Sequence, residues 1–232
     1  IEAAPTTVAK TPVAFLFPGQ GSQAVGMCKD VAEIPKVKQM YETAKTILGY
    51  DLLKICLEGP KSDLDNTIHS QPALFVAGLS AVEKLRQEDP EAVESASATA
   101  GRSLGEYTAL VFADAMSFED ALKVVKVRAE SMAEAAGAGA PHGMLSIVGL
   151  GDAEIEGICK DVKAKMPNID DSETVCQIAN YLFPQGRVVS GHKKALEEVQ
   201  KQATSKGALK AQAVAVSGAF HTSLMSSASA NL

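Results

Sequence analysis

The chain has 232 residues, of which 46% are hydrophobic and 22% charged, and this composition is typical of a globular protein with a substantial core. Its formal net charge of −6 argues against binding to nucleic acid or to an anionic membrane surface. No apolar run approaches the roughly 18 residues that a membrane-spanning helix requires.

The first elements along the chain are a polar leader, a strand and a glycine-rich loop. We interpret residues 1–12 as a flexible leader. The apolar run Val13–Phe17 lies between two prolines and predicts a buried strand. The loop at 18–23 is rich in glycine, but the sequence after it lacks both the third glycine of a dinucleotide fingerprint and the lysine of a phosphate loop. Neither nucleotide motif is therefore present.

Three long helices are expected in the first part of the chain. The patterns of residues 31–57 and 62–88 predict helices, and Gln71 with Pro72 should break the second near its middle. A third helix is expected over 118–136, because Ser117 and the acidic residue three positions later form a capping-box pattern.

Residues 101–105 form a Gly-x-Ser-x-Gly pattern between an Ala-rich segment and a helix-forming segment. The glycines let the backbone turn sharply, so Ser103 can project its hydroxyl from a strand-to-helix corner. The start of the following helix offers N–H groups to a developing oxyanion, which favours acyl transfer. The structural alternative is that small residues merely gather at a turn.

Beyond the glycine-rich hinge at 137–141, the chain predicts a β-α-β-β-α-β unit, which is the ferredoxin-like arrangement. Its expected strands and helices are 143–150, 152–165, 174–182, 187–190, 192–205 and 208–216. We therefore predict an α/β protein in which a small ferredoxin-like lobe, residues 139–216, is inserted into a larger α/β lobe made of residues 13–138 and 217–232.

A serine nucleophile needs a general base, and the chain has only four histidines. His69 lies inside a predicted helix, His142 in the hinge, and His192 at a surface helix start beside two lysines. His221 instead follows the last predicted strand at a strand-to-helix corner, where catalytic groups gather in α/β proteins. His221 is therefore the favoured base.

Arg128 lies at the edge of the apolar face of the helix expected over 118–136. It is either an arginine stem that extends along the surface or a guanidinium held in a pocket for an anionic group. Spacing alone leaves both possibilities open. The four cysteines are dispersed without a Cys-x-x-Cys pair, so neither a metal site nor a disulfide framework is expected.

Four separate stretches together resemble the malonyl-CoA:acyl-carrier-protein transacylase family. They are Phe17–Gln23 (FPGQGSQ), Gly101–Glu106 (GRSLGE), Arg128 and Gly218–His221 (GAFH). The resemblance runs from about Pro12 to the end of the chain and looks closest to plastid forms from plants and algae. It implies the plastid stroma as the compartment, with the cytoplasm or the mitochondrial matrix as alternatives.

The resemblance implies a role for each matching residue. Ser103 would be the nucleophile and His221 the base that takes its proton. Backbone N–H groups of Gln20 and Leu104 would form the oxyanion hole, and Arg128 would bind the free carboxylate of the malonyl unit.

Three further residues match positions near the site. Phe220 would narrow the pocket in favour of malonyl over branched acyl groups, and Gln71 and Asn180 would lie near the active-site floor. Two departures accompany the match. Arg102 stands where many relatives have histidine. The given sequence ends at Leu232, where relatives continue, so we expect the C-terminal part of the large lobe to be missing from it, and we expect weak or no turnover if nothing follows Leu232.

The implied fold is an α/β-hydrolase-like large lobe with a ferredoxin-like small lobe. The implied activity is transfer of malonyl from malonyl-CoA to the phosphopantetheine thiol of acyl carrier protein, with no metal or nucleotide cofactor and no nucleic-acid or membrane partner. Two alternatives remain at this point: a serine acyl hydrolase or thioesterase, and a catalytically impaired relative with a structural or binding role.

Overall fold

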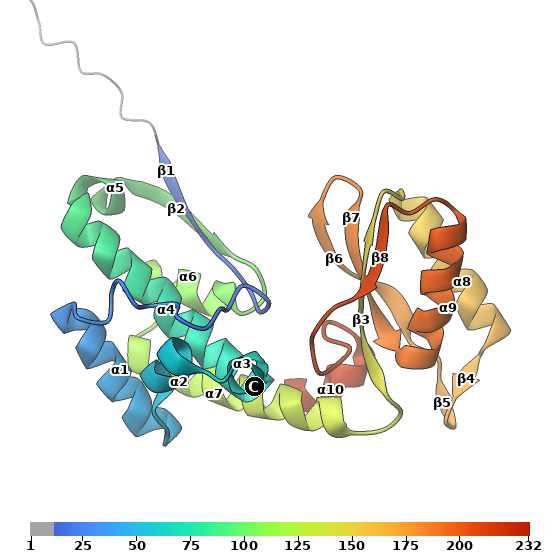
Figure 1. Ribbon diagram of the computed structural model, residues 1–232, viewed down its shortest axis with the longest axis horizontal. Helices are drawn as coiled ribbons and strands as arrows, with labels where there is room; N and C mark the ends of the chain where they lie inside the picture. Colours follow the sequence, from blue (N-terminus) through green and yellow to red (C-terminus); the bar gives the residue numbers. More distant parts are fainter. Residues whose placement is uncertain (1–11) are drawn as a thin grey trace, which may run out of the picture. The chain divides into compact units, whose positions relative to one another are not determined.

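The computed structural model describes residues 12–232, which form two compact units (Figure 1). The first unit contains residues 12–64 and 69–125, and the second contains 65–68 and 126–232. The predicted leader lies outside the described residues apart from Pro12. Among the helices of residues 12–232, none combines the length and apolar character that crossing a bilayer demands.

In the first unit, β1 (Val13–Phe17) and β2 (Ala96–Gly101) form a two-stranded parallel sheet. The strand predicted at 13–17 is confirmed, but the expectation that it is buried is wrong. Phe17 is only 7% exposed, whereas Leu16 is 77% exposed. The reason is that one face of the strand packs on the helix after β2, where Phe15 and Phe112 stack at 4.4 Å, and Leu16 points to the other face.

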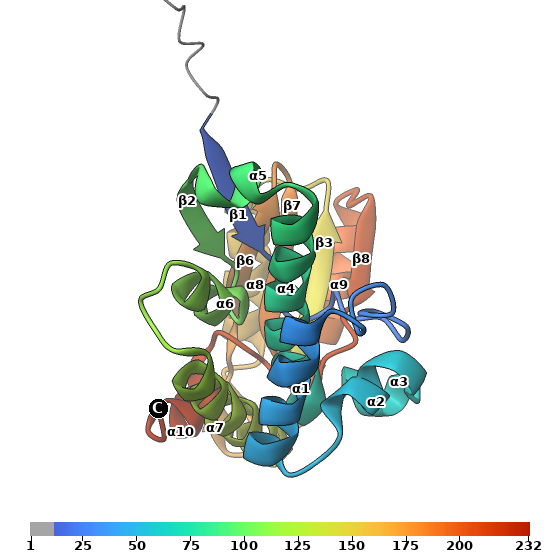
Figure 2. The same ribbon diagram turned by 90° about the vertical axis from the view of Figure 1, so that its left-hand side faces the viewer.

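Seven helices lie wholly or partly in this unit, and Figure 2 shows several of them. They are α1 (Pro35–Leu48), α2 (Leu52–Glu58), α3 (Lys61–Asp65), α4 (Thr67–Glu88), α5 (Pro90–Glu94), α6 (Gly105–Phe112) and α7 (Phe118–Gly137). The single helix predicted over 31–57 is divided, because Gly49 adopts a left-handed φ of 86° and ends α1. The capping box predicted at Ser117 is confirmed by a 3.1 Å bond from the Asp120 N–H to the Ser117 hydroxyl.

The second predicted helix breaks at a different place from the one expected. The break falls at Asn66, whose side chain accepts a 3.0 Å bond from the Ile68 N–H, and α4 continues through Pro72. A proline inside a helix costs about 3 kcal/mol. Phe75 and Val76, just beyond it, are fully buried, and each such side chain contributes about 1.5–3 kcal/mol. Burial of α4 therefore offsets the cost of the proline.

The second unit contains a four-stranded antiparallel sheet with strand order β6-β7-β3-β8. Its elements are β3 (His142–Val148), α8 (Asp152–Lys165), β6 (Cys176–Phe183), β7 (Gly186–His192), α9 (Lys193–Ser205) and β8 (Lys210–Ala213). The predicted β-α-β-β-α-β order is confirmed. A small hairpin of β4 (Asn168–Ile169) and β5 (Ser172–Glu173), followed along the chain by β6, was not predicted.

Both faces of this sheet are covered. Leu145 and Val189 point into a cluster with α8 and α9, which lie together on one face (Figure 1). Met144 and Val188, one position away on the same strands, point to the opposite face. There they pack against the second half of α7 and the segment containing η1 (Ser223–Met225) and α10 (Ser226–Ser229).

The predicted α/β class, with its ferredoxin-like part, is confirmed. The lobe boundaries expected at residues 138 and 216 stay a prediction. The compact units divide inside α7, because this helix is continuous over 118–137 and because residues 217–232 pack in the second unit.

Candidate active site

The predicted strand-to-helix corner is present between β2 and α6. Ser103 occupies it with a φ of +54°, a left-handed conformation that side chains other than glycine rarely adopt. The corner is closed by a 3.0 Å bond from the Gly105 N–H to the Arg102 carbonyl and a 3.2 Å bond from the Glu106 N–H to the Ser103 carbonyl. The Ser103 side chain therefore stands at the start of α6.

Both glycines of the motif are required by close backbone packing. A Cβ added at Gly101 would lie 2.0 Å from the backbone of Gly105, and one added at Gly105 would lie 2.2 Å from the Phe17 carbonyl oxygen. Packing therefore explains the two glycines without any reference to catalysis. The strained serine between them is not explained by packing, and strain of this kind gathers at functional sites.

The residues expected around the nucleophile occupy three neighbouring elements of the first unit. Gln20 lies in the loop after β1, where a Cβ at Gly19 would approach the Arg102 carbonyl oxygen to 2.7 Å, so this loop touches the corner itself. Leu104 precedes α6 and its side chain is 1% exposed, while Gln71 in α4 is fully buried. Arg102 is exposed.

The other expected residues lie in the second unit, where Arg128, Gln177 and His221 line one cavity of about 560 Å³. Arg128 is only 8% exposed, so of its two possible placements the structure has the buried one. His221 is exposed and has a φ of +62°. The sequence interpretation gave no role to Gln177, although it lies in the strand predicted at 174–182, three residues before Asn180.

Phe220 and Asn180 are placed differently from the cavity residues. Phe220 is 5% exposed and packs in the cluster that contains Met132 and Met144, and it does not belong to the described lining of the Arg128 cavity. Asn180 is half-buried on β6, three residues beyond Gln177.

The remaining histidines serve as buried or local hydrogen-bonding groups. His192 was predicted at the surface, and this is wrong: it is 1% exposed, and its Nδ1 accepts a 3.0 Å bond from the Val175 N–H. His142 is not in a hinge but on β3, 4% exposed. Burial lowers the pKa of both rings below their ordinary value of 6.5. His69 pairs through Nδ1 with the Asp63 carbonyl at 2.9 Å.

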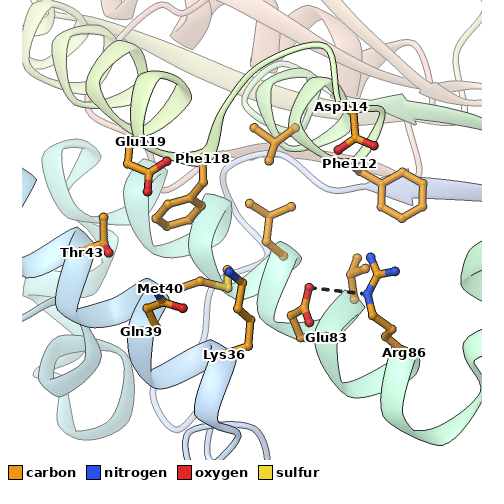
Figure 3. Close-up of a pocket in the computed structure, with 13 residues that line it drawn as sticks. Lys36, Gln39, Met40, Thr43, Glu83, Arg86, Phe112, Asp114, Phe118 and Glu119 are labelled. Atoms are coloured by element: carbon orange, nitrogen blue, oxygen red, sulfur yellow. Dashed lines mark ion pairs between the residues drawn. The ribbon is translucent and has the colours of Figure 1, made fainter.

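A second cavity, of about 290 Å³, lies in the first unit between α1, α4 and the segment joining α6 to α7 (Figure 3). Its wall is apolar around Met40 and Phe118, and its rim carries both signs of charge, including a Glu83–Arg86 pair at 3.7 Å. It contains none of the residues that the sequence predicted for the site. Within residues 12–232, no group of three or more His, Cys, Asp or Glu side chains is arranged to hold a metal ion.

Comparison with known proteins places this chain in a family. The acyl transferase domain matches residues 14–232. Mouse mitochondrial malonyl-CoA-acyl carrier protein transacylase is 47% identical over 211 residues, which cover 91% of this chain and 55% of the mouse protein. The chain thus spans about half the length of this curated relative.

Solved structures give the same result. The acyl-carrier-protein S-malonyltransferase of Burkholderia pseudomallei has a TM-score of 0.84 and 36% identity, and the match covers 95% of this chain and 68% of that one. A malonyl-transacylase in complex with a type II PKS acyl-carrier protein has a TM-score of 0.84 and 34% identity, with coverage of 95% and 68%. The chain belongs to the acyl transferase domain family.

Proposed function

We propose that this chain transfers a malonyl group from malonyl-CoA to the phosphopantetheine thiol of acyl carrier protein in fatty acid biosynthesis, through an ester on Ser103. The observation that carries the proposal is the cavity that a buried Arg128 and an exposed His221 line together. An imidazole and a guanidinium that line one cavity suit an acyl substrate with a free carboxylate. The names of the mouse and Burkholderia relatives agree with this activity, and the carrier-protein complex agrees with this partner.

In the first half-reaction, Ser103 Oγ attacks the thioester carbonyl while His221 takes the hydroxyl proton. The C–S bond then breaks, and the CoA sulfur leaves with that proton. In the second half-reaction, the carrier thiol gives its proton to His221, and its sulfur attacks the seryl ester. Ser103 Oγ leaves and regains the proton. The N–H groups of Gln20 and Leu104 would stabilise the oxyanion in both steps.

Arg128 would hold the malonyl carboxylate. Its planar guanidinium donates two parallel hydrogen bonds to a carboxylate, and burial strengthens them because water is largely excluded. Gln177, on the same cavity wall, can donate a further bond from its amide. A neutral acyl group would gain nothing from the arginine, so this residue separates a malonyl transferase from a general esterase.

Phe220 immediately precedes His221. We propose that its side chain limits the size of the acyl group, both by its own bulk and by fixing the backbone next to His221. Gln71 and Asn180 would support the floor of the site. The proposed transfer uses no metal or nucleotide cofactor. The mitochondrial name of the mouse relative favours the mitochondrial matrix over the plastid stroma as the compartment.

The decisive experiment is covalent labelling of the full chain with radiolabelled malonyl-CoA. Wild type should retain label after denaturation, Ser103→Ala should not, and holo acyl carrier protein should remove the label from the wild type. Release of free malonate without any carrier would indicate a hydrolase. Absence of label on folded protein would refute the enzyme and leave a binding role.

A second experiment tests the carboxylate site. Arg128→Ala should lower malonyl labelling by about 30- to 1,000-fold, equivalent to about 2–4 kcal/mol, while labelling by acetyl-CoA is retained or improved. Lys123→Ala, which removes an exposed charge from the same helix, is the matched control and should change neither. Equal losses with both acyl groups would reject Arg128 as the carboxylate ligand.

A further inference from the structure

The segment that carries His221 is tied to the sheet by a buried histidine. His142 Nδ1 accepts a 2.8 Å hydrogen bond from the Ala219 N–H, two residues before His221. Ala219 is fully buried and His142 is 4% exposed, so water cannot replace this bond when it is lost. Because Nδ1 accepts a hydrogen bond, the ring is neutral and its proton is on Nε2.

The same ring also interacts with the end of α7. Backbone groups of Ala135 and Ala138 hydrogen-bond to His142, and they favour its protonated form less strongly than burial disfavours it. Ala135 lies seven residues after Arg128, so both are on the same side of α7. His142 therefore links the helix that carries the predicted carboxylate ligand to the segment that carries the predicted base.

Two other contacts hold this segment. The fully buried Ser190 hydroxyl donates to the Phe220 carbonyl at 2.9 Å, with the Gly143 carbonyl at 3.4 Å. A Cβ at Gly218 would lie 2.8 Å from the Ala136 side chain and 3.3 Å from His142 Cε1. The backbone before His221 is thus in close contact with α7, β3 and β7.

His221 itself needs such support. Its φ of +62° is strained for a residue with a side chain, and strain of this kind costs about 1–3 kcal/mol. It persists only where neighbouring contacts determine the backbone. The bonds from His142 and Ser190 act on the two residues directly before it.

We propose that His142 is a positioning residue, whose neutral ring holds the 217–221 segment so that the His221 imidazole faces the Arg128 cavity. Protonation of His142 at Nδ1 would place two N–H donors, from His142 and Ala219, against each other and release the 217–221 segment. The charged or titratable groups next to His142 are Lys193, at the start of α9, and His192, its direct partner across the β3–β7 ladder. The positive charge of Lys193 lowers the pKa of His142, and His142 in turn lowers the pKa of His192. The catalytic part of this inference rests on the proposed function.

The test compares two substitutions in the full chain. His142→Asn retains an acceptor, because the Asn side-chain oxygen lies at about the position of Nδ1, whereas His142→Leu removes it. We expect Leu to lower kcat for Ser103 acylation about 10- to 100-fold with little change in KM, and Asn to remain within about threefold of wild type. Equal activity of the Leu and Asn variants would overturn the proposal.

The pH profile gives a readout that a purely structural role would not change. If His142 and His221 must both be neutral, kcat of the wild type should fall on the acid side with the uptake of two protons. In His142→Asn the fall should correspond to the uptake of one proton. The same two-proton slope in His142→Asn would refute the proposed role of His142 protonation.

His192→Leu is the matched control, because it removes the same kind of buried bond, to the Val175 N–H, outside the 217–221 segment. It should lower the melting temperature as His142→Leu does and leave acylation within about threefold of wild type. An equal loss of acylation in both variants would show general destabilisation and contradict positioning.

A readout without catalysis separates this inference from the proposed function. Amide exchange at Ala219 should be at least about 10-fold faster in His142→Leu than in wild type and near normal in His142→Asn. If wild type is never acylated by malonyl-CoA, the proposed function fails, and faster exchange still supports the link between His142 and the segment. Unchanged exchange in the Leu variant would refute that link even in an active enzyme.

Discussion

Replacing Gly105 by alanine tests whether the close approach of β1 to the start of α6 shapes the corner that holds Ser103. The new Cβ would lie 2.2 Å from the Phe17 carbonyl oxygen and 2.8 Å from the Pro18 carbonyl oxygen. Because both neighbours are backbone atoms, relief requires movement of β1 by roughly 1 Å. The Phe17 carbonyl also accepts the 3.1 Å bond from the Arg102 N–H, which such a movement would break.

The change in the free energy of unfolding is the sum of three contributions, of which two are destabilising and one is stabilising. Overpacking costs about 1–3 kcal/mol and the lost hydrogen bond about 1 kcal/mol. Better helix propensity of alanine returns at most about 1 kcal/mol. The free energy of unfolding of Gly105→Ala should therefore fall by about 1–3 kcal/mol, which corresponds to roughly 2–4 °C in melting temperature for each kcal/mol.

Gly157→Ala is the matched control for this prediction. Gly157 is also inside a helix, α8, but a Cβ there would meet nothing within 4 Å. This variant should be about 0.5–1 kcal/mol more stable than wild type. Urea unfolding followed by circular dichroism measures both variants. A Gly105→Ala protein as stable as wild type, beside a stabilised Gly157→Ala, would refute the steric argument.

Three further predictions concern strain, thiol reactivity and pH. Ser103→Gly should be about 0.5–1 kcal/mol more stable than Ser103→Ala in urea unfolding, because only glycine relieves the positive φ; the reverse order would contradict strain at this residue. Cys28 should react with iodoacetamide at least about 10-fold faster than the three buried cysteines, because a hydrogen bond from Cys56 lowers the pKa of the half-buried Cys28 thiol. Peptide mass spectrometry can measure the labelling, and uniform labelling of all four cysteines would disprove this. Burial lowers the folded-state pKa of His142 and His192 below the unfolded value of 6.5, so their contribution to stability is complete above pH 6.5 and is lost as the pH falls through the lowered pKa values. The free energy of unfolding should then fall with a limiting slope of about 1.4 kcal/mol per pH unit for each ring. Unfolding free energies that stay level from pH 7 to 5 would exclude this dependence.

Local sequence signals predicted most of the second unit. The helix expected over 152–165 has those bounds in the structure, and the strands and the remaining helix differ only at their ends. The corner at Ser103 was also predicted, because the glycines of Gly-x-Ser-x-Gly allow a sharp local turn of the backbone. These signals succeed because helix caps, glycine turns and alternating patterns act over a few residues.

Errors arose where distant residues decide the outcome. Pro72 should end a helix by its own chemistry, but burial of the residues after it keeps α4 continuous. The sequence places His192 beside two lysines and so suggests an exposed residue. In the structure it is 1% exposed, and its Nδ1 accepts a hydrogen bond from the Val175 N–H, 17 residues earlier in the chain. Burial depends on what packs against a residue, and the sequence near that residue does not contain this information.

By itself, then, the chain determined the α/β class, the order of elements from 143 to 216 and the identity of the candidate serine, histidine and arginine. Only the tertiary structure decided between the two placements of Arg128, brought it to one cavity with His221 and Gln177, and joined His142 to the Ala219 backbone. The physical reason is the distance along the chain over which each interaction acts. Backbone propensities act between near neighbours in the chain. Burial and hydrogen bonding instead join residues up to 150 positions apart, as between the Thr67 and Ser217 hydroxyls, and they form only when the chain folds.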